Sequence, residues 1–300
     1  MEPAHSVFQQ DRDKMSVLVV GTDGVIGSRL SRVLAHAGRS VIETTRRLTE
    51  PAACRIHLDL ASTDSFDVLP RCRAAVLCAA VTSMESCQRD PAATRQINVT
   101  NTVRLARQLM ATGTHVIFLS SNTVFDGSYP YVKATDRICP KTEYGRQKAD
   151  AESSLLGLRG AVTIVRLSKI SFPEMPLMLG WINNLSAGRT ISPYSDRRMS
   201  PLPLSLVVEL LRRVIEIGLT GIIQLSATSD ISYFEAALYL AHQLNYNDKL
   251  IRPVSFVKGE SDHSPMNTTL ESNGIEGLYL EAPSPFAALD EFVMRNTCRH

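Results

Sequence analysis

Short apolar runs alternate along the chain with segments in which apolar residues recur every three or four positions. The first run, residues 16–20, is almost continuously apolar, which is typical of a strand buried on both faces of a parallel sheet. A helix pattern follows at once, and one face of it carries Ile26, Leu30, Val33 and Leu34. This stretch therefore predicts a buried strand that leads directly into a helix.

Apolar runs predict five further strands, at residues 40–45, 55–60, 74–80, 115–121 and 161–167. Helix patterns lie between them. One begins at Asp90-Pro91, with proline in the first turn, and another runs from Tyr144 to Leu156. This alternation of strands and helices predicts an α/β fold with a doubly wound parallel sheet of the Rossmann type.

The pattern changes after Ser171, where segments rich in proline, serine and arginine interrupt it. We expect a helix at 204–217, a strand at 221–225, a helix at 233–244 and a loop-rich tail. The predicted division is a disordered extension at 1–14 and a Rossmann domain at 15–170, to which 203–228 returns. Residues 171–202 and 229–300 then form a smaller C-terminal substrate lobe.

Composition excludes several classes of protein. The net charge of +2 is too close to neutral to indicate a nucleic-acid or membrane-surface partner, and no apolar run is long enough to span a bilayer. The polar stretch 1–14 lacks the apolar core of a signal peptide. The six cysteines show neither a C-x-x-C pair nor metal-ligand spacing. We therefore expect a cytoplasmic protein without a metal.

The first strand ends in Gly21-x-x-Gly24-x-x-Gly27, and a helix begins within this motif. Such glycines permit a tight turn, a close approach of backbone N–H groups to a pyrophosphate, and close packing of the helix on the strand. The motif therefore predicts a dinucleotide site. The alternative is an ordinary strand–turn–helix unit with convenient glycines.

Two later strand ends refine this prediction. Thr45 ends the second strand where an acid would bind the ribose of NAD, and Arg46 and Arg47 follow, as a 2′-phosphate requires. NADP(H) is therefore the preferred cofactor and NAD(H) the second choice. A solvated basic pair is the alternative. Asp59 is placed to meet the adenine amino group, or else is a turn acid.

Tyr144 and Lys148 are four residues apart, so they share one face of a predicted helix. A lysine ammonium beside a phenol favours the phenolate, which would lower the pKa of Tyr144 and suit it to proton transfer. Ser121, at the end of the preceding strand, could bond the same reacting oxygen. The similar pair Tyr129 and Lys133 lies in a loop and is rejected. An exposed Tyr–Lys pair without function is the alternative.

These motifs resemble those of the extended short-chain dehydrogenases/reductases, and most closely the dTDP-4-dehydrorhamnose reductase group. The resemblance rests on the glycine motif, Asp59-Leu60, Cys78-Ala79-Ala80, Asn98, the segment 120–125 and Tyr144-Gly-x-x-Lys148. The segment 120–125 departs from the group's usual Ser-Thr-Asp-Tyr-Val-Phe. By this resemblance, the cofactor-binding residues are Gly21, Asp23, Gly24, Val25, Ile26, Gly27, Arg46, Arg47, Asp59, Leu60, Cys78, Ala79, Ala80, Asn98, Tyr144 and Lys148.

The resemblance implies an oxidoreductase that reduces a nucleotide-linked 4-keto-6-deoxy sugar. Tyr144 would donate the proton, Lys148 would hold the nicotinamide ribose, Ser121 would bond the carbonyl oxygen, and Asn98 would support the lysine. Arg166 is expected to form a structural ion pair.

Two alternatives remain open. One is a sugar-nucleotide epimerase or dehydratase. The other is a cofactor-binding regulatory subunit like the β subunit of methionine adenosyltransferase. A homodimer or a partner enzyme stays open as well.

Overall fold

The computed structural model describes residues 16–47, 54–62, 66, 69–256 and 265–297. The extension predicted at 1–14 lies outside these residues. Among the described residues, no helix has the length and apolar character needed to cross a membrane.

Seven strands form the main sheet, in the order β10-β6-β5-β4-β1-β2-β3. Their bounds are β1 (Val17–Val20), β2 (Val41–Thr45), β3 (Arg55–His57), β4 (Ala74–Leu77), β5 (His115–Ser121), β6 (Val162–Leu167) and β10 (Gly221–Leu225). Strand β1 pairs in parallel with both β2 and β4, and β4 pairs in parallel with β5. The strand order therefore reverses between β1 and β4, and the predicted doubly wound sheet is confirmed. In such sheets, ligands bind outside the carboxyl ends of the strands at this reversal.

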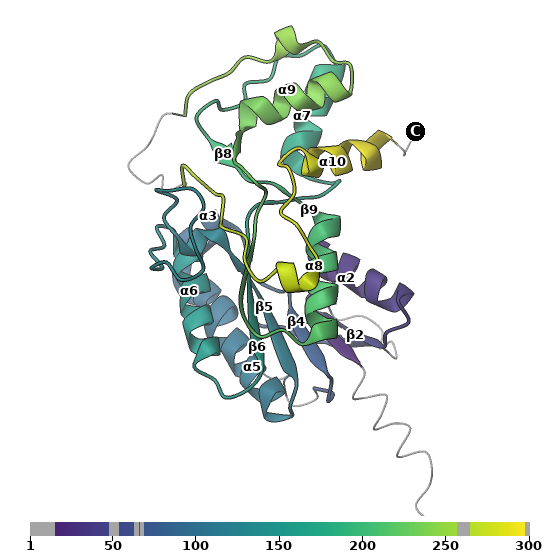
Figure 1. Ribbon diagram of the computed structural model, residues 1–300, viewed down its shortest axis with the longest axis vertical. Coiled ribbons are helices and arrows are strands. Elements are labelled where there is room, and N and C mark those ends of the chain that lie inside the picture. Colours follow the sequence, from purple (N-terminus) through teal and green to yellow (C-terminus); the bar gives the residue numbers. More distant parts are fainter. Residues whose placement is uncertain (1–15, 48–53, 63–65, 67–68, 257–264, 298–300) are drawn as a thin grey trace, which may run out of the picture. The chain divides into compact units, whose positions relative to one another are not determined.

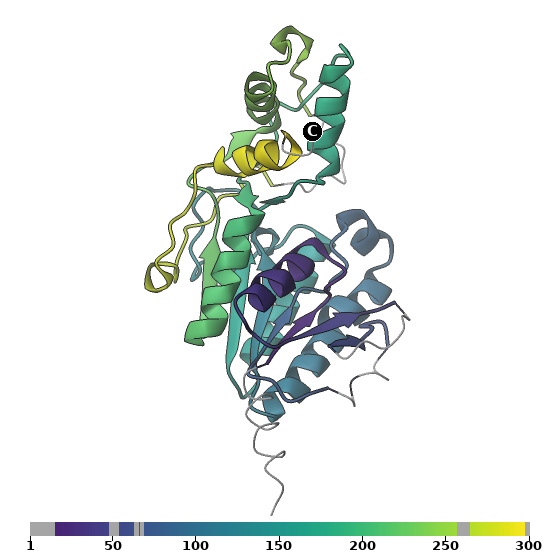
Figure 2. The same cartoon turned by 90° about the vertical axis from the view of Figure 1, so that its right-hand side faces the viewer.

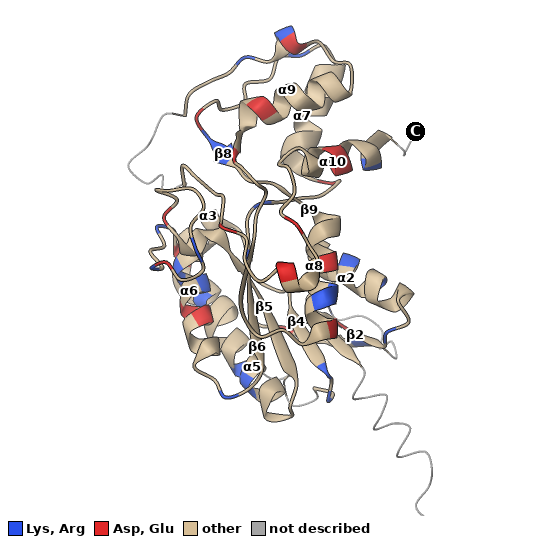
Figure 3. Cartoon of the chain, viewed as in Figure 1, with Lys and Arg blue, Asp and Glu red and all other residues tan. Residues whose placement is uncertain are grey.

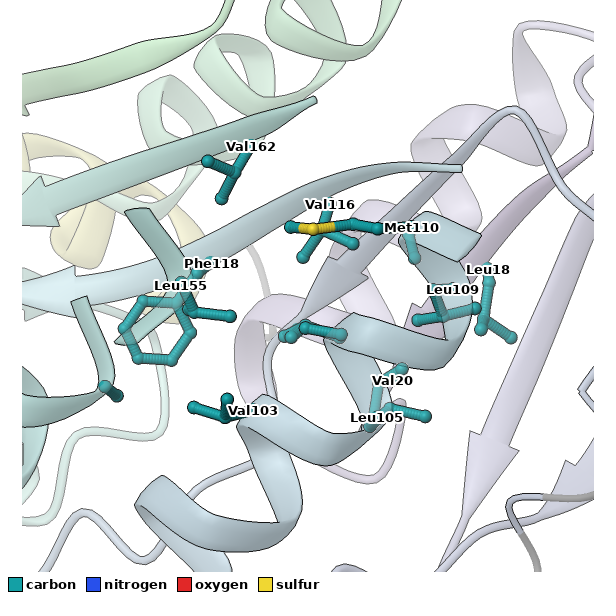
Figure 4. Close-up of a cluster of buried hydrophobic side chains, with 14 of the residues drawn as sticks. Leu18, Val20, Val103, Leu105, Leu109, Met110, Val116, Phe118, Leu155 and Val162 are labelled. Carbon is teal, nitrogen blue, oxygen red and sulfur yellow. The ribbon is translucent and has the colours of Figure 1, made fainter. Parts of the chain in front are cut away.

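Helices cover both faces of this sheet (Figure 1; Figure 2). Helices α2 (Val25–His36) and α8 (Leu204–Ile217) lie on one face, and α5 (Thr102–Ala111) and α6 (Glu143–Leu156) lie on the other. Beneath α5 and α6, leucines and other apolar side chains interlock with residues of β1, β4 and β5 (Figure 4). Leu105, Leu155 and Phe118 are almost completely buried, and burial of each such side chain contributes about 1.5–3 kcal/mol. This core fixes α6 against β5.

The predicted long helix after β4 is interrupted. Helix α4 (Pro91–Arg95) and α5 are separated by a π-helical turn, η2 (Gln96–Asn101), and a short helix, α3 (Met84–Arg89), precedes them. Asp90 caps α4 by accepting the Ala93 amide at 3.0 Å. The extra residue in a π turn changes which side chains face inward. Here Asn98 and Asn101 are both buried.

Basic and acidic residues both occur along α8 (Figure 3). Arg212 bonds Glu209 at 2.7 Å and Glu216 at 2.5 Å, one helical turn away on either side. The bonds from Arg212 and Arg213 lower the pKa of Glu209 to about 2. Such pairs stabilise an exposed helix face and need no ligand to explain them.

Residues divide between two compact units. The first contains the chain up to Val124 together with 142–166 and 208–223, and the second contains 125–141, 167–207 and 224–300. The sequence division placed 125–141 in the first unit. The structure places this loop in the second, where Tyr131 donates its amide to Thr269 at 3.0 Å and Gln224 donates to the Val132 carbonyl at 3.0 Å.

Helices of the second unit pack around their own apolar cluster, which includes Met178, Trp181 and Phe292. They are α7 (Pro176–Ser186), α9 (Tyr233–Gln243) and α10 (Ala287–Thr297). Two-stranded pairs join β7 (Ile170–Ser171) to β9 (Leu202–Pro203) and β8 (Arg198–Met199) to β11 (Ile231–Ser232). The prediction of a loop-rich tail is wrong at α10. The sequence predicted no helix at 176–186, where a proline at the first helical position begins α7.

Candidate active site

The glycine turn joins β1 to α2 within the first unit. Gly21 has φ +91°, and a Cβ there would lie 2.8 Å from the Cβ of Ala79 in the loop after β4. A Cβ on Gly27 would overlap the Gly21 carbonyl oxygen, which it faces across the turn. Gly24 is the N-cap of α2, and Val25 and Ile26 form the first turn, with no side chain bonded to the helix end. The amides at this end are therefore available to an anion.

Strand β2 holds the glycine turn through Thr44. Its hydroxyl accepts the Gly21 amide at 2.9 Å, and its carbonyl accepts the Thr22 hydroxyl at 2.9 Å. The next residue, Thr45, is buried and donates its hydroxyl to Asp23 at 2.6 Å. The end of β2 and the glycine turn thus form one hydrogen-bonded unit.

Asp23 also pairs with two arginines. Its carboxylate lies 2.5 Å from Nη2 of Arg55 and 4.0 Å from Nε of Arg47. Arg46 and Arg47 follow β2 and are exposed. Arg55 opens β3, and nothing in its sequence position distinguished it, since the contact arises from the pairing of β3 beside β2. Sequence reasoning therefore missed one of the cations at this end of the sheet.

Asp59, which was expected to meet the adenine amino group, bonds a nearby backbone amide in this structure. One carboxylate oxygen of Asp59 accepts the amide of Ala61 at 2.9 Å, as a turn acid does. Leu60 is buried in the core, and its carbonyl accepts the Asn101 side chain at 2.7 Å. After β4, Cys78 donates its amide to the Val20 carbonyl at 2.9 Å, and Ala79 and Ala80 continue the loop beside the glycine turn.

Asn98 lies on the π-helical turn and holds the loop after β4. Its side chain accepts the Val81 amide at 2.8 Å and donates to the Val81 carbonyl at 2.9 Å. It also donates to the Gln147 side chain on α6 at 2.8 Å. Asn98 therefore connects this loop to the helix residue next to Lys148.

Tyr144 and Lys148 lie on one face of α6, and both are buried. The helix begins at the Thr142 cap, whose hydroxyl accepts the Gly145 amide at 3.0 Å. The Lys148 ammonium donates to the Leu119 carbonyl on β5 at 2.8 Å. It also lies 4.4 Å from the centroid of the Phe118 ring and 5.8 Å from that of Tyr144. The ammonium is thus held at the carboxyl end of β5.

Burial is the main cause of the pKa shifts of Tyr144 and Lys148. It lowers the pKa of Lys148 to about 8, although the negative charge of Glu152 opposes the shift. Burial raises the pKa of Tyr144, and the nearby Cys87 acts in the same direction. The expectation that Lys148 lowers the Tyr144 pKa is therefore wrong for this structure. The cost of placing a phenolate out of contact with water sets the direction of the shift.

Ser121 ends β5, and its hydroxyl is engaged locally. It accepts the Thr123 amide at 3.2 Å and the Thr123 hydroxyl at 3.1 Å, and it donates to the Asn122 side chain at 3.2 Å. Ser121, Tyr144 and Lys148 all belong to β5 or α6 in the first unit. The arrangement offers one phenol, one ammonium and one hydroxyl at the same end of the sheet.

A buried ion pair lies on the neighbouring turn of α6. Arg166 and Glu152 are almost fully buried and meet at 2.7 Å, so the expected structural ion pair is confirmed. Glu152 also accepts the hydroxyl of Ser120, the residue before Ser121. The pair therefore links β5, α6 and β6, and it supplies the negative charge that raises the Lys148 pKa.

Comparison with known proteins finds a matching family and several relatives of the chain. The family model described as the RmlD substrate binding domain matches residues 15–297. A probable low-salt glycan biosynthesis reductase of Haloferax volcanii, Agl14, is 24% identical, with 88% of this chain and 92% of that protein covered. Methionine adenosyltransferase 2 subunit beta of Pongo abelii is 22% identical, with coverages of 90% and 84%.

A solved structure shows the same fold. The dTDP-4-dehydrorhamnose reductase of Bacillus anthracis, in complex with NADP, matches with a TM-score of 0.82 and 20% identity. The match covers 94% of this chain and 98% of that one. The similarity therefore extends through both units.

Proposed function

The chain belongs to the RmlD substrate binding domain family, and we propose on that premise that it reduces a nucleotide-linked 4-keto-6-deoxy sugar with NADP(H). NAD(H) is the second cofactor of the proposal. The observation that carries it is the buried Tyr144 and Lys148 pair at the carboxyl end of β5, beside Ser121. The names of the relatives, two of them reductases, support the same class of reaction.

The residues present fit a dinucleotide. The glycine turn leaves no room for a Cβ at Gly21 or Gly27, and the first-turn amides of α2 carry no side-chain cap. Nε of Arg55 is buried and has no hydrogen-bond partner among the described residues, so one donor near the end of β2 is left for an anion. Gly21, Gly24 and Arg55, with Arg46 and Arg47, would hold the phosphates. When bound, the nicotinamide supplies the hydride.

Tyr144 is the proton donor of the proposed reaction. Its raised pKa keeps the phenol protonated at neutral pH, so the proton is present when a carbonyl oxygen arrives. Lys148 is mostly protonated below about pH 8, and its ammonium stabilises the phenolate once the proton has left. Ser121 offers a second hydroxyl to the same oxygen after releasing Asn122.

Turnover with a substrate panel tests this proposal. The protein is incubated with NADPH and dTDP-, GDP- or UDP-linked 4-keto sugars, and the nicotinamide absorbance is followed. We expect oxidation with at least one sugar and a decrease of about 10²–10⁴-fold in Tyr144→Phe, while NADPH still binds. Tyr129→Phe is the matched control, because that exposed tyrosine also precedes a lysine by four residues. Full activity of Tyr144→Phe contradicts the mechanism.

A second candidate function rests on the similarity to methionine adenosyltransferase 2 subunit beta. In that case the chain binds the cofactor and acts through a partner enzyme. A stoichiometric enzyme recovered with the tagged chain, together with NADPH that binds and is never oxidised by any sugar of the panel, favours this candidate.

A further inference from the structure

We propose that Asp23 is the residue that sets the choice between NADP(H) and NAD(H). Its carboxylate accepts the free 2′-hydroxyl of NAD(H) and opposes the 2′-phosphate of NADP(H), so that both cofactors bind. The inference rests on the proposed function, because it requires a dinucleotide at the glycine turn.

The first support is the position of the carboxylate. Dinucleotide-binding sheets usually carry an acid at the end of β2, where it bonds the ribose hydroxyl. Thr45 stands there in this chain, and the side chain of Asp23, 22 positions earlier, reaches the Thr45 hydroxyl at 2.6 Å. The carboxylate therefore occupies the end of β2 although the acid belongs to the glycine turn.

The second support is the charge around that carboxylate. Asp23 touches Arg55 at 2.5 Å and lies 4.0 Å from Arg47, so it offsets part of the positive charge that would attract a phosphate. The Asp23 side chain is 22% exposed, which keeps its charge only partly screened. A 2′-phosphate carries about −1.5 to −2 charges, like other phosphate monoesters, and is repelled by this carboxylate.

The third support explains why NADP(H) still binds. Arg55 gives Nη2 to Asp23, but its buried Nε has no hydrogen-bond partner among the described residues. An unpaired buried donor is costly, and an anion at the end of β2 would satisfy it. Arg47 is 75% exposed and can turn toward the same anion. The site thus combines one acceptor for a hydroxyl with donors for a phosphate.

Binding measurements on the full chain test the inference without turnover. The dissociation constants for NADP⁺ and NAD⁺ are measured by isothermal titration calorimetry for the wild type, Asp23→Asn and Arg55→Gln. We expect Asp23→Asn to increase the preference for NADP⁺ over NAD⁺ about tenfold, because one repelling charge is removed. Arg55→Gln decreases that preference by a similar factor.

Asp150→Asn is the matched control. Asp150 also forms a 2.5 Å ion pair with an arginine, Arg95, and its side chain is 52% exposed. This variant should leave the preference unchanged. Asp23→Ser, which keeps an oxygen for Thr45, replaces Asp23→Asn if the latter does not fold and should show the same increase.

The outcomes separate the two proposals. If the wild type binds both cofactors and the preference is unchanged or decreased in the Asp23 variants, this inference is overturned and the proposed function stands. If the wild type binds neither NADP⁺ nor NAD⁺, the proposed function fails and the inference fails with it.

Discussion

The side chain of Asn98 bonds both backbone groups of Val81, accepting the amide at 2.8 Å and donating to the carbonyl at 2.9 Å. This pairing imitates the one that a neighbouring strand would give, and it is made by a side chain on a π-helical turn. One amide side chain therefore bonds both backbone groups of a residue in the loop after β4. The Val81 carbonyl also accepts the Cys87 thiol at 3.5 Å, whereas Asn98 is the side chain that bonds its amide.

Replacing Asn98 with alanine should therefore destabilise the protein. We expect Asn98→Ala to lower the free energy of unfolding by about 1–3 kcal/mol, since the Val81 amide loses its Asn98 acceptor and the Gln147 side chain loses a donor. Urea denaturation followed by circular dichroism measures this change. The exposed Asn183 is the control, and Asn183→Ala should stay within about 0.5 kcal/mol of the wild type. Equal effects of the two variants would show that the Val81 contacts contribute nothing.

Alanine variants of Gly21 and Gly38 can distinguish the cost of a strained backbone conformation from the cost of steric overlap with neighbouring atoms. Both have positive φ, at +91° and +73°, but only at Gly21 would a Cβ meet other atoms. Gly38→Ala should cost about 1–2 kcal/mol from backbone conformation alone. Gly21→Ala should cost at least about 1 kcal/mol more, because Ala79 has to move. Thermal unfolding of both variants measures the difference, and equal melting temperatures would contradict the predicted close packing.

The ion pair of Arg166 and Glu152 predicts a strongly non-additive mutant cycle. Arg166→Met should destabilise by about 3–5 kcal/mol, because it leaves the Glu152 charge buried and unpaired. Adding Glu152→Leu should restore part of that loss, since the double variant no longer buries an unpaired carboxylate. Arg212→Met, which breaks partly exposed pairs on α8, should cost no more than about 1 kcal/mol. If denaturant unfolding shows that the losses in free energy of unfolding from the two single variants simply add, Arg166 and Glu152 do not depend on each other.

Protonation of Lys148 predicts an alkaline limit of activity. The free protein loses this proton near pH 8, so kcat/KM with NADPH should fall above about that pH. Glu152→Gln should move the limit to lower pH, because the negative charge of Glu152 raises the Lys148 pKa. A pH–rate profile measured below the melting temperature of each variant checks both statements. A limit that moves upward in Glu152→Gln would contradict the assignment.

The same group affects stability in a defined direction. The folded pKa of about 8 lies below the ordinary value of 10.5, so between these pH values the unfolded chain binds more protons at this position. The contribution of Lys148 to the free energy of unfolding therefore increases as pH rises through that window. The wild type should gain stability from pH 8 to 10 relative to Lys148→Met, as urea denaturation at each pH can show.

Local patterns were sufficient for most of the first unit. The strand at 115–121 and the helix at 204–217 were predicted with the bounds that the structure shows, because the first contains an unbroken apolar run and the second has apolar residues at helical spacing. The π-helical turn was not predicted. Its hydrogen bonds replace a helical pattern that the sequence continues to favour, and the buried contacts of Asn98 and Asn101 compensate for it.

Prediction of the candidate site was limited by contacts between distant residues. The spacing of Tyr144 and Lys148 was visible because one helix presents both. Arg55 was missed since its partner Asp23 is 32 positions away. The direction of the Tyr144 pKa was wrong because burial of the phenol depends on the whole packed unit and leaves no sign in a four-residue spacing.

The division into two units has a consequence for synthesis on the ribosome. The first unit is complete only when residue 223 has been added, since it takes residues 208–223 as its last segment. The chain passes between the units after residues 124, 141, 166, 207 and 223. Each unit is therefore built from three separate segments of the chain. Domains generally fold as units during synthesis. Nascent chains that end before β10 therefore lack the strand that completes the β6 edge of the sheet.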